Sequence, residues 1–160
     1  MKKLVVYYSY TGNTKKIADM IKNKLDCDIL ELEPLTPFSK DYDEVVNEYQ
    51  NNSIDNKEVP IKDINVNLDD YDEIIIGTPV WWYTISPVVV TFLKENDLSN
   101  KTIYPFATNA GWLGKTFKDI EKLCHNSEIE KEMNIVFESY SDKLKTTEKE
   151  LNDWINSIEK

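Results

Sequence analysis

Apolar runs alternate with helical patterns along this chain, an order typical of strand and helix units arranged around a parallel sheet. Five apolar runs predict strands over 3–8, 27–34, 72–79, 101–109 and 133–139. Apolar residues at helical spacing predict helices over 13–25, from 87 onward, over 115–124 and over about 142–158. The pattern therefore predicts an α/β fold, an open, doubly wound, five-stranded parallel sheet in a three-layer sandwich.

Two segments lie between the second and third predicted strands, and only the first has a recognisable pattern. Asp41 and Glu44 have the spacing of a capping box, which predicts a short helix over roughly 41–51. The segment 52–70 is polar, irregular and longer than most connections in a compact domain. It is either a functional loop or merely a mobile one, and the sequence leaves both readings open.

The composition limits the classes of protein to consider. A chain of 160 residues with 41% hydrophobic content can bury one good core, so residues 1–160 are expected to form a single domain. The net charge of −10 makes nucleic acid and anionic membrane surfaces poor partners, because both are polyanionic. A protein partner with a basic surface, or a small ligand, is more compatible with this charge. Nothing in the sequence predicts an oligomeric state.

Neither the cysteines nor the N-terminal residues point to an oxidising or membrane environment. Cys27 and Cys124 lie far apart without metal-ligand spacing, so neither a disulfide framework nor a metal site is expected. The first apolar run has about five residues, short of the roughly 7–15 that a signal peptide needs. No run is long enough to cross a membrane. The expected location is the reducing cytoplasm.

The first predicted strand ends in a cluster of polar residues that runs directly into a helix. The cluster consists of Ser9, Thr11, Gly12, Asn13 and Thr14. Hydroxyl and amide donors, a glycine that permits close backbone approach, and the free amides of a helix N-terminus together favour a phosphate-binding loop. The alternative is an ordinary capped turn, for which one hydroxyl would suffice.

The third predicted strand ends in an aromatic segment. This second loop consists of Pro79, Val80, Trp81, Trp82 and Tyr83. Rings at a strand end offer a flat apolar surface on which a planar ligand can stack. The alternative is that some of these rings pack into the protein, and for at least one of them we expect that outcome.

The fourth predicted strand ends in a third polar turn. It consists of Thr108, Asn109, Ala110 and Gly111, followed by another ring at Trp112. In doubly wound sheets, ligands bind beyond the carboxyl ends of the strands, so the three loops are expected to share one site. A phosphate loop, an aromatic surface and a polar turn together describe a phosphorylated, flat, hydrogen-bonding ligand.

The segments SYTGNT (9–14), GTPVWWYT (77–84) and ATNAGWLG (107–114) together resemble the flavodoxin-like family, especially members with a tryptophan pair in the second loop. The resemblance covers essentially the whole chain. It implies the strand order 2-1-3-4-5 and bound FMN. By position, it implies that the first loop holds the FMN phosphate. It also implies that 79–83 line the isoalloxazine and that 108–111 reach its pyrimidine edge and the ribityl chain.

This chain departs from the family's simplest electron carriers in two places. The resemblance leads one to expect a glycine in the second loop, where a peptide turns over to steady the one-electron-reduced flavin, but residues 80–86 contain none. A side-chain-bearing residue would enter a costly conformation there. The usual aromatic of the third loop is also missing, unless Trp112 substitutes. The resemblance implies electron transfer through bound FMN to a redox partner protein. The two departures leave an alternative open, which is an FMN-dependent NAD(P)H oxidoreductase. Such an enzyme would transfer hydride, two electrons at a time, to a quinone-like or other small acceptor.

Other motifs carry less weight. The segment 109–116 ends in G-K-T like a nucleotide P-loop, but Asn109 stands where the first glycine is required. His125 is the only histidine and is expected at a solvated helix end. A receiver-type signalling domain would need acids where Ser9 and Thr78 stand. No nucleophile and base pair suggests hydrolysis, whereas an interaction protein that has lost its cofactor remains open.

Overall fold

The computed structural model of the chain describes residues 2–38, 40–41, 44–45 and 59–159. The strands are β1 (Lys3–Tyr7), β2 (Asp28–Glu31), β3 (Glu73–Trp81), β4 (Thr84–Ile85), β5 (Thr102–Asn109), β6 (Glu128–Ile129) and β7 (Met133–Val136). The helices are α1 (Asn13–Leu25), α3 (Pro87–Glu95), α4 (Thr116–Leu123) and α5 (Glu148–Glu159), with a 3₁₀ turn η1 (Leu68–Asp70). No helix in these described ranges is both long and apolar enough to span a bilayer.

The strands form one sheet with the order β2-β1-β3-β5-β6, in which β7 also pairs with β5. Thr102 and Ile103 pair with β6, and 106–109 pair with β7, so two short strands fill one position beside β5. This is the expected order 2-1-3-4-5, because β5 is the fourth predicted strand and β6 with β7 stands in place of the fifth. All these pairings are parallel, and only β4 runs antiparallel to its neighbour β3.

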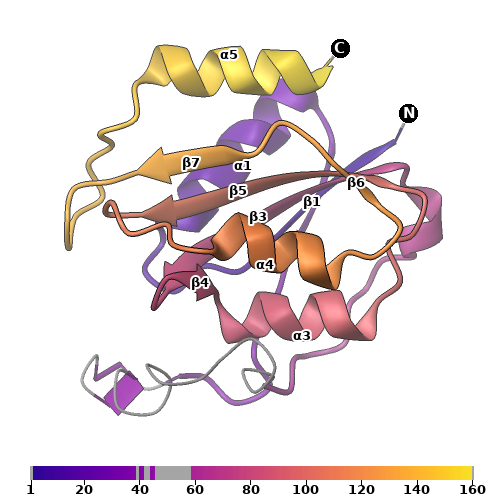
Figure 1. Cartoon of the computed structure of the whole chain (residues 1–160), viewed down its shortest axis with the longest axis horizontal. Helices are drawn as coiled ribbons and strands as arrows, with labels where there is room; N and C mark the ends of the chain where they lie inside the picture. Colours follow the sequence, from indigo (N-terminus) through magenta and orange to yellow (C-terminus); the bar gives the residue numbers. More distant parts are fainter. Residues whose placement is uncertain (1, 39, 42–43, 46–58, 160) are drawn as a thin grey trace.

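Helices cover both faces of the sheet (Figure 1). One core cluster joins alternate residues of β1, including Val5 and Tyr7, to the buried faces of α1 and α5. The other cluster joins Leu4 and Val6 to α3 and to Ile120 of α4. The alternation along β1 is the period of two that an extended strand imposes. The predicted α/β three-layer sandwich is confirmed.

The C-terminal part of the chain corrects two predicted boundaries. The strand predicted over 133–139 ends at Val136, and the helix predicted from about 142 begins at Glu148. The later start has a local cause, because Thr147 and Glu150 form a reciprocal capping box: the Glu150 amide donates to Thr147 Oγ1 over 3.1 Å, and the Thr147 amide donates to Glu150 Oε2 over 2.9 Å.

The long connection before β3 is packed where the structure describes it. Val59 exchanges two hydrogen bonds with the Thr91 hydroxyl on α3, at 2.9 and 2.6 Å. The Leu35 amide donates to the Pro60 carbonyl over 2.8 Å, which fixes the segment against the residues that follow β2. Of the helix predicted over 41–51, the residues at 44 and 45 are helical, and 42–43 and 46–51 lie outside the described residues.

Candidate functional site

A pocket of about 430 Å³ lies at the carboxyl ends of β1, β3 and β5. All three predicted loops contribute to its wall, through Thr11, Asn13, Pro79, Val80, Trp81, Trp82, Tyr83, Thr108, Asn109 and Ala110. Four other predicted residues do not line it: Ser9, Gly12, Thr14 and Gly111. The parallel sheet explains the convergence, because its strands all end at one edge.

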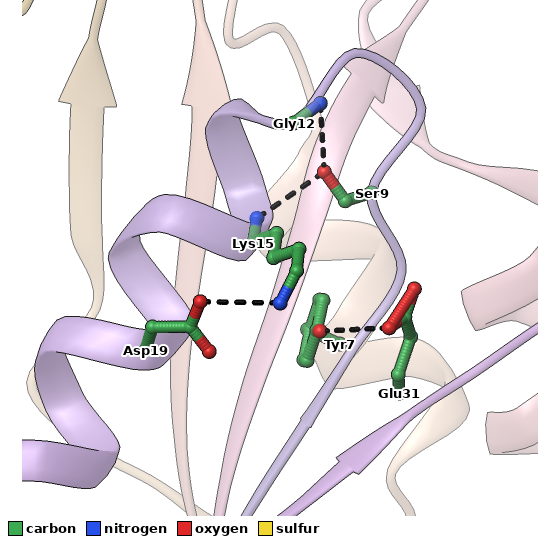
Figure 2. A network of polar contacts seen from close by, with 6 residues as sticks. All are labelled: Tyr7, Ser9, Gly12, Lys15, Asp19 and Glu31. Carbon is green, nitrogen blue, oxygen red and sulfur yellow. Dashed lines mark hydrogen bonds and ion pairs between the residues drawn. The ribbon is translucent and has the colours of Figure 1, made fainter.

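The first loop is held by a network around Ser9 (Figure 2). Ser9 Oγ accepts hydrogen bonds from the amide of Gly12 over 3.1 Å and from that of Lys15 over 3.2 Å. Gly12, with φ at 103°, is the N-cap of α1 and occupies the left-handed region that glycine enters without strain. Ser9 therefore caps the start of α1, as the alternative of an ordinary capped turn predicts. Its hydroxyl hydrogen can still donate to a further acceptor. The amides of Asn13 and Thr14 have no acceptor within the helix, as is usual in a first turn.

Two further residues of the first loop connect it to other parts of the site. Thr14 Oγ1 lies 2.7 Å from Thr108 Oγ1, and this buried hydroxyl pair ties the first turn of α1 to the end of β5. Asn13 Nδ2 donates to the carbonyl of Ser141 over 2.9 Å, which holds the segment after β7 beside the pocket. Thr14 thus fixes the loop without lining the pocket, whereas Asn13 lines the pocket wall.

The second loop is a two-residue β-hairpin. Trp81 pairs with Thr84, and the connecting residues Trp82 and Tyr83 have φ of 48° and 69°. Positive φ at both positions is the geometry of a type I′ turn, which usually takes Asn-Gly. For residues with large side chains this conformation costs about 1–2 kcal/mol each. Such conformations are expected to be costly in a loop without glycine, and the structure nevertheless has two of them.

The three rings of the hairpin have different environments. Trp81 is buried, with edge-to-face contacts to Phe38 at 4.9 Å, Tyr10 at 5.4 Å and Trp82 at 5.6 Å between ring centroids. Trp82 is half-buried, whereas Tyr83 is 55% exposed. The expectation that at least one ring packs into the protein is confirmed for Trp81. Trp82 and Tyr83 both line the pocket.

The third loop is ordered by Asn109. Its Oδ1 accepts hydrogen bonds from the amides of Gly111 over 2.8 Å and Trp112 over 3.1 Å. Its Nδ2 donates to Asn134 Oδ1 on β7 over 2.6 Å. Asn109 therefore shapes its own turn, and Gly111, with φ at 118°, takes the left-handed position that the turn requires.

Sequence reasoning missed part of the wall. Ser139 and Tyr140 line the pocket from the segment after β7, and Tyr10 and Val45 line it as well. The signal for the first two was available, since Ser139 ends the last predicted strand and Tyr140 directly follows it, at the edge where ligands bind in this architecture. Tyr140 is 95% exposed and Trp112 is 59% exposed, so rings stand around the pocket mouth. Within the described ranges, no group of three or more His, Cys, Asp or Glu side chains is placed to hold a metal ion.

Fold and pocket together define a class of protein, the doubly wound α/β domains with a ligand pocket at the strand ends. A family model described as flavodoxin matches residues 2–158, so the chain belongs to the flavodoxin family. The resemblance read from the three loops is thereby confirmed. Among curated proteins, no sequence matches the chain significantly.

Solved structures agree with this assignment. A protein from Bacteroides eggerthii that is assigned as a flavoprotein is 25% identical, with a TM-score of 0.78 over 98% of this chain and 97% of that one. A flavoprotein from Lactobacillus acidophilus, solved in complex with FMN, is 24% identical, with a TM-score of 0.66 over 83% and 91% of the two chains. Oxidised flavodoxin 2 from Bacillus cereus is 20% identical, with a TM-score of 0.58 over 99% and 97%. At these identities, the likeness to the Lactobacillus acidophilus and Bacillus cereus proteins shows a shared fold alone.

Proposed function

We propose that this chain binds FMN in the pocket at the carboxyl ends of β1, β3 and β5 and transfers electrons through it. The observation that carries the proposal is the convergence of a donor-rich loop, an aromatic hairpin and a polar turn on one pocket in a flavodoxin-family chain. The Lactobacillus acidophilus protein of the same fold, solved with FMN, supports the choice of ligand. Bound FMN supplies the redox chemistry, because its ring system accepts and returns electrons.

The donor set of the first loop fits a phosphate. The first-turn amides of Asn13 and Thr14, which have no acceptor within α1, the positive end of the α1 dipole and the Thr11 hydroxyl all favour an anion there. The Ser9 hydroxyl keeps its hydrogen for an anionic oxygen, since its lone pairs accept from two amides. These residues would hold the phosphate without a metal.

The second and third loops fit a flat heterocycle. Trp82 and Tyr83 would line one side of it, and 108–110 would present backbone and amide groups to its polar edge. Trp81 closes the inner wall with apolar surface, which limits the access of water to the ring. The chain's charge of −10 disfavours an anionic reduced flavin, so we expect a lowered reduction potential.

The same charge supports docking to a redox partner with a basic surface. Both Cys27 and Cys124 are free thiols, as suits a protein of the reducing cytoplasm, which is the location we propose.

A second function has an observation of its own in its favour. Exposed rings, Tyr83, Trp112 and Tyr140, stand around the pocket mouth, where a planar small molecule could stack. This arrangement would suit an FMN-dependent oxidoreductase that takes hydride from NAD(P)H and passes two electrons to a quinone-like or other small acceptor.

An anaerobic reductive titration of the FMN-loaded protein tests both functions. The visible spectrum is followed while dithionite, NADH or NADPH is added in steps. For an electron carrier we expect dithionite to reduce the flavin and the nicotinamides to react negligibly. Rapid bleaching by either nicotinamide would establish the oxidoreductase instead. If the protein does not retain FMN, both proposals are wrong.

A further inference from the structure

We propose that Asp119 on α4 is a positioning residue for the aromatic hairpin, acting through Thr84 to hold Trp82 and Tyr83 in the geometry that receives the flavin ring. This inference rests on the proposed FMN binding. Asp119 does not line the pocket, and neither its sequence position nor the resemblance singles it out.

The contact is a buried side-chain hydrogen bond. Thr84 Oγ1 donates to Asp119 Oδ2, and the two residues are 3% and 1% exposed. Thr84 directly follows Tyr83 and begins β4, the short strand that closes the hairpin. A bond at this point therefore fixes the hairpin immediately after its two left-handed residues.

Two more contacts join the same helix end to Tyr83. The Lys115 amide donates to the Tyr83 carbonyl over 2.8 Å. At Gly114, a Cβ would lie 2.3 Å from Tyr83 Cβ, so only glycine allows this approach. The Asp119 amide donates to the Lys115 carbonyl over 2.8 Å, which places these anchors within one helical turn. A conformation unfavourable for Trp82 and Tyr83 is thus held from outside the hairpin.

An acidic side chain suits this position better than an apolar one. Asp119 lies in the first turn of α4, where the helix dipole favours a negative group. A carboxylate that accepts from a buried hydroxyl makes a stronger and more directional bond than a neutral acceptor. An apolar residue would fill the space but would not define the orientation of β4.

The test compares FMN with riboflavin, which has the same ring system but no phosphate. For Asp119→Ala we expect the affinities for both ligands to fall by the same factor, about tenfold or more, because a hydrogen bond to a charged group is lost. The ratio of the two dissociation constants should stay at its wild-type value. Asp119→Asn keeps an acceptor oxygen for Thr84, and its affinities should stay within about threefold of wild type.

Tyr104→Phe is the matched control, because it also removes a buried hydroxyl-to-carboxyl hydrogen bond, from Tyr104 to Glu73, at the opposite edge of the sheet. This variant should lose stability to urea and bind both flavins like wild type. The near-ultraviolet circular dichroism of the apoprotein gives a readout without ligand. The tryptophan bands should change in Asp119→Ala and remain unchanged in Tyr104→Phe.

Several outcomes would overturn the inference. A folded Asp119→Ala that binds both flavins like wild type, or whose two affinities fall by different factors, would do so. So would equal losses of affinity in the Tyr104→Phe control. If Asp119→Ala does not fold, Thr84→Val removes the same bond without changing shape, and the same criteria apply to it. A wild-type protein that binds no flavin would refute the proposed function, while the dichroism of the apoproteins would still decide whether Asp119 orders the hairpin.

Discussion

The two edges of the sheet use polar residues differently. At the amino edge, polar side chains are buried against one another: Tyr104 OH donates to Glu73 Oε1 over 2.8 Å, and Lys3 Nζ lies 3.1 Å from Glu73 Oε2. The buried Tyr71 also donates from its OH to Oδ2 of the exposed Asp28 over 2.6 Å. At the carboxyl edge, buried pairs such as Thr14 with Thr108 support the loops, and other polar groups of these loops surround a pocket. Paired polar side chains fill the amino edge, whereas the loops at the carboxyl edge leave a pocket between them.

The backbone shows the same difference. Left-handed residues in the connections at the amino edge are Asp26, Asn100 and Asn126. Asparagine and aspartate enter this conformation comparatively easily. Around the pocket, the non-glycine residues with positive φ are Trp82, Tyr83 and Tyr140, which are all aromatic. Strained conformations that persist at a pocket are typical of functional sites.

The largest effect on stability is expected at the amino edge. Glu73 Oε2 is buried without a hydrogen bond among the described residues, so the ion pair with Lys3 is what compensates its burial. Lys3→Met should lower the free energy of unfolding by about 3 kcal/mol, measured in urea. The affinity for FMN should change little, because the pocket lies at the other edge.

The exposed pair of Lys62 with Glu33, at 3.6 Å, provides the control for this prediction. Lys62→Met should cost less than about 1 kcal/mol, because exposed ion pairs contribute little. Equal losses of unfolding free energy in the two lysine variants would show that the pair of Lys3 with Glu73 contributes no more than an exposed ion pair. That result would contradict the account of a closed amino edge.

Gly114→Ala should have a smaller effect on stability but a clear effect on the pocket. The added methyl group would overlap Tyr83, and φ at 59° is unfavourable for alanine. We expect a loss of about 1–3 kcal/mol in unfolding free energy and at least about tenfold weaker FMN binding, measured by fluorescence titration.

Gly111→Ala separates backbone strain from steric overlap. Gly111 also has positive φ, at 118°, but no atom lies within 4 Å of its added Cβ. Its effect on FMN affinity should therefore be smaller than that of Gly114→Ala. The reverse order would show that the hairpin does not depend on its contact with Gly114.

The smallest expected effect is a pH dependence at the amino edge. The hydrogen bond to Asp28, together with burial, raises the pKa of Tyr71 to about 12 from the usual 10.0. The folded protein therefore holds this proton more tightly than the unfolded chain does. This contribution to stability is complete below pH 10 and is lost as the pH rises toward 12. In Tyr71→Phe, the decline of urea stability over this range should be shallower, and an unchanged decline would contradict the assignment.

The sequence predicted the sheet well because buried parallel strands are continuous apolar runs that need no tertiary information. It missed β4 and β6, which have two residues each and show no periodicity. The capping box at Thr147 and Glu150 was readable, yet the apolar stripe extended the predicted helix beyond it. The three loops were found from their residue types. The burial of Trp81 and the contribution of Ser139 and Tyr140 depend on tertiary packing, which one sequence does not display.

The most direct test of the central claim is an equilibrium titration of the wild-type apoprotein with FMN and, separately, with riboflavin. We expect one FMN per chain and an affinity for FMN about tenfold or more above that for riboflavin, because the first loop supplies donors for the phosphate. Equal affinities would contradict the phosphate role of 9–14. The absence of FMN binding would contradict the assignment of the pocket as a flavin site.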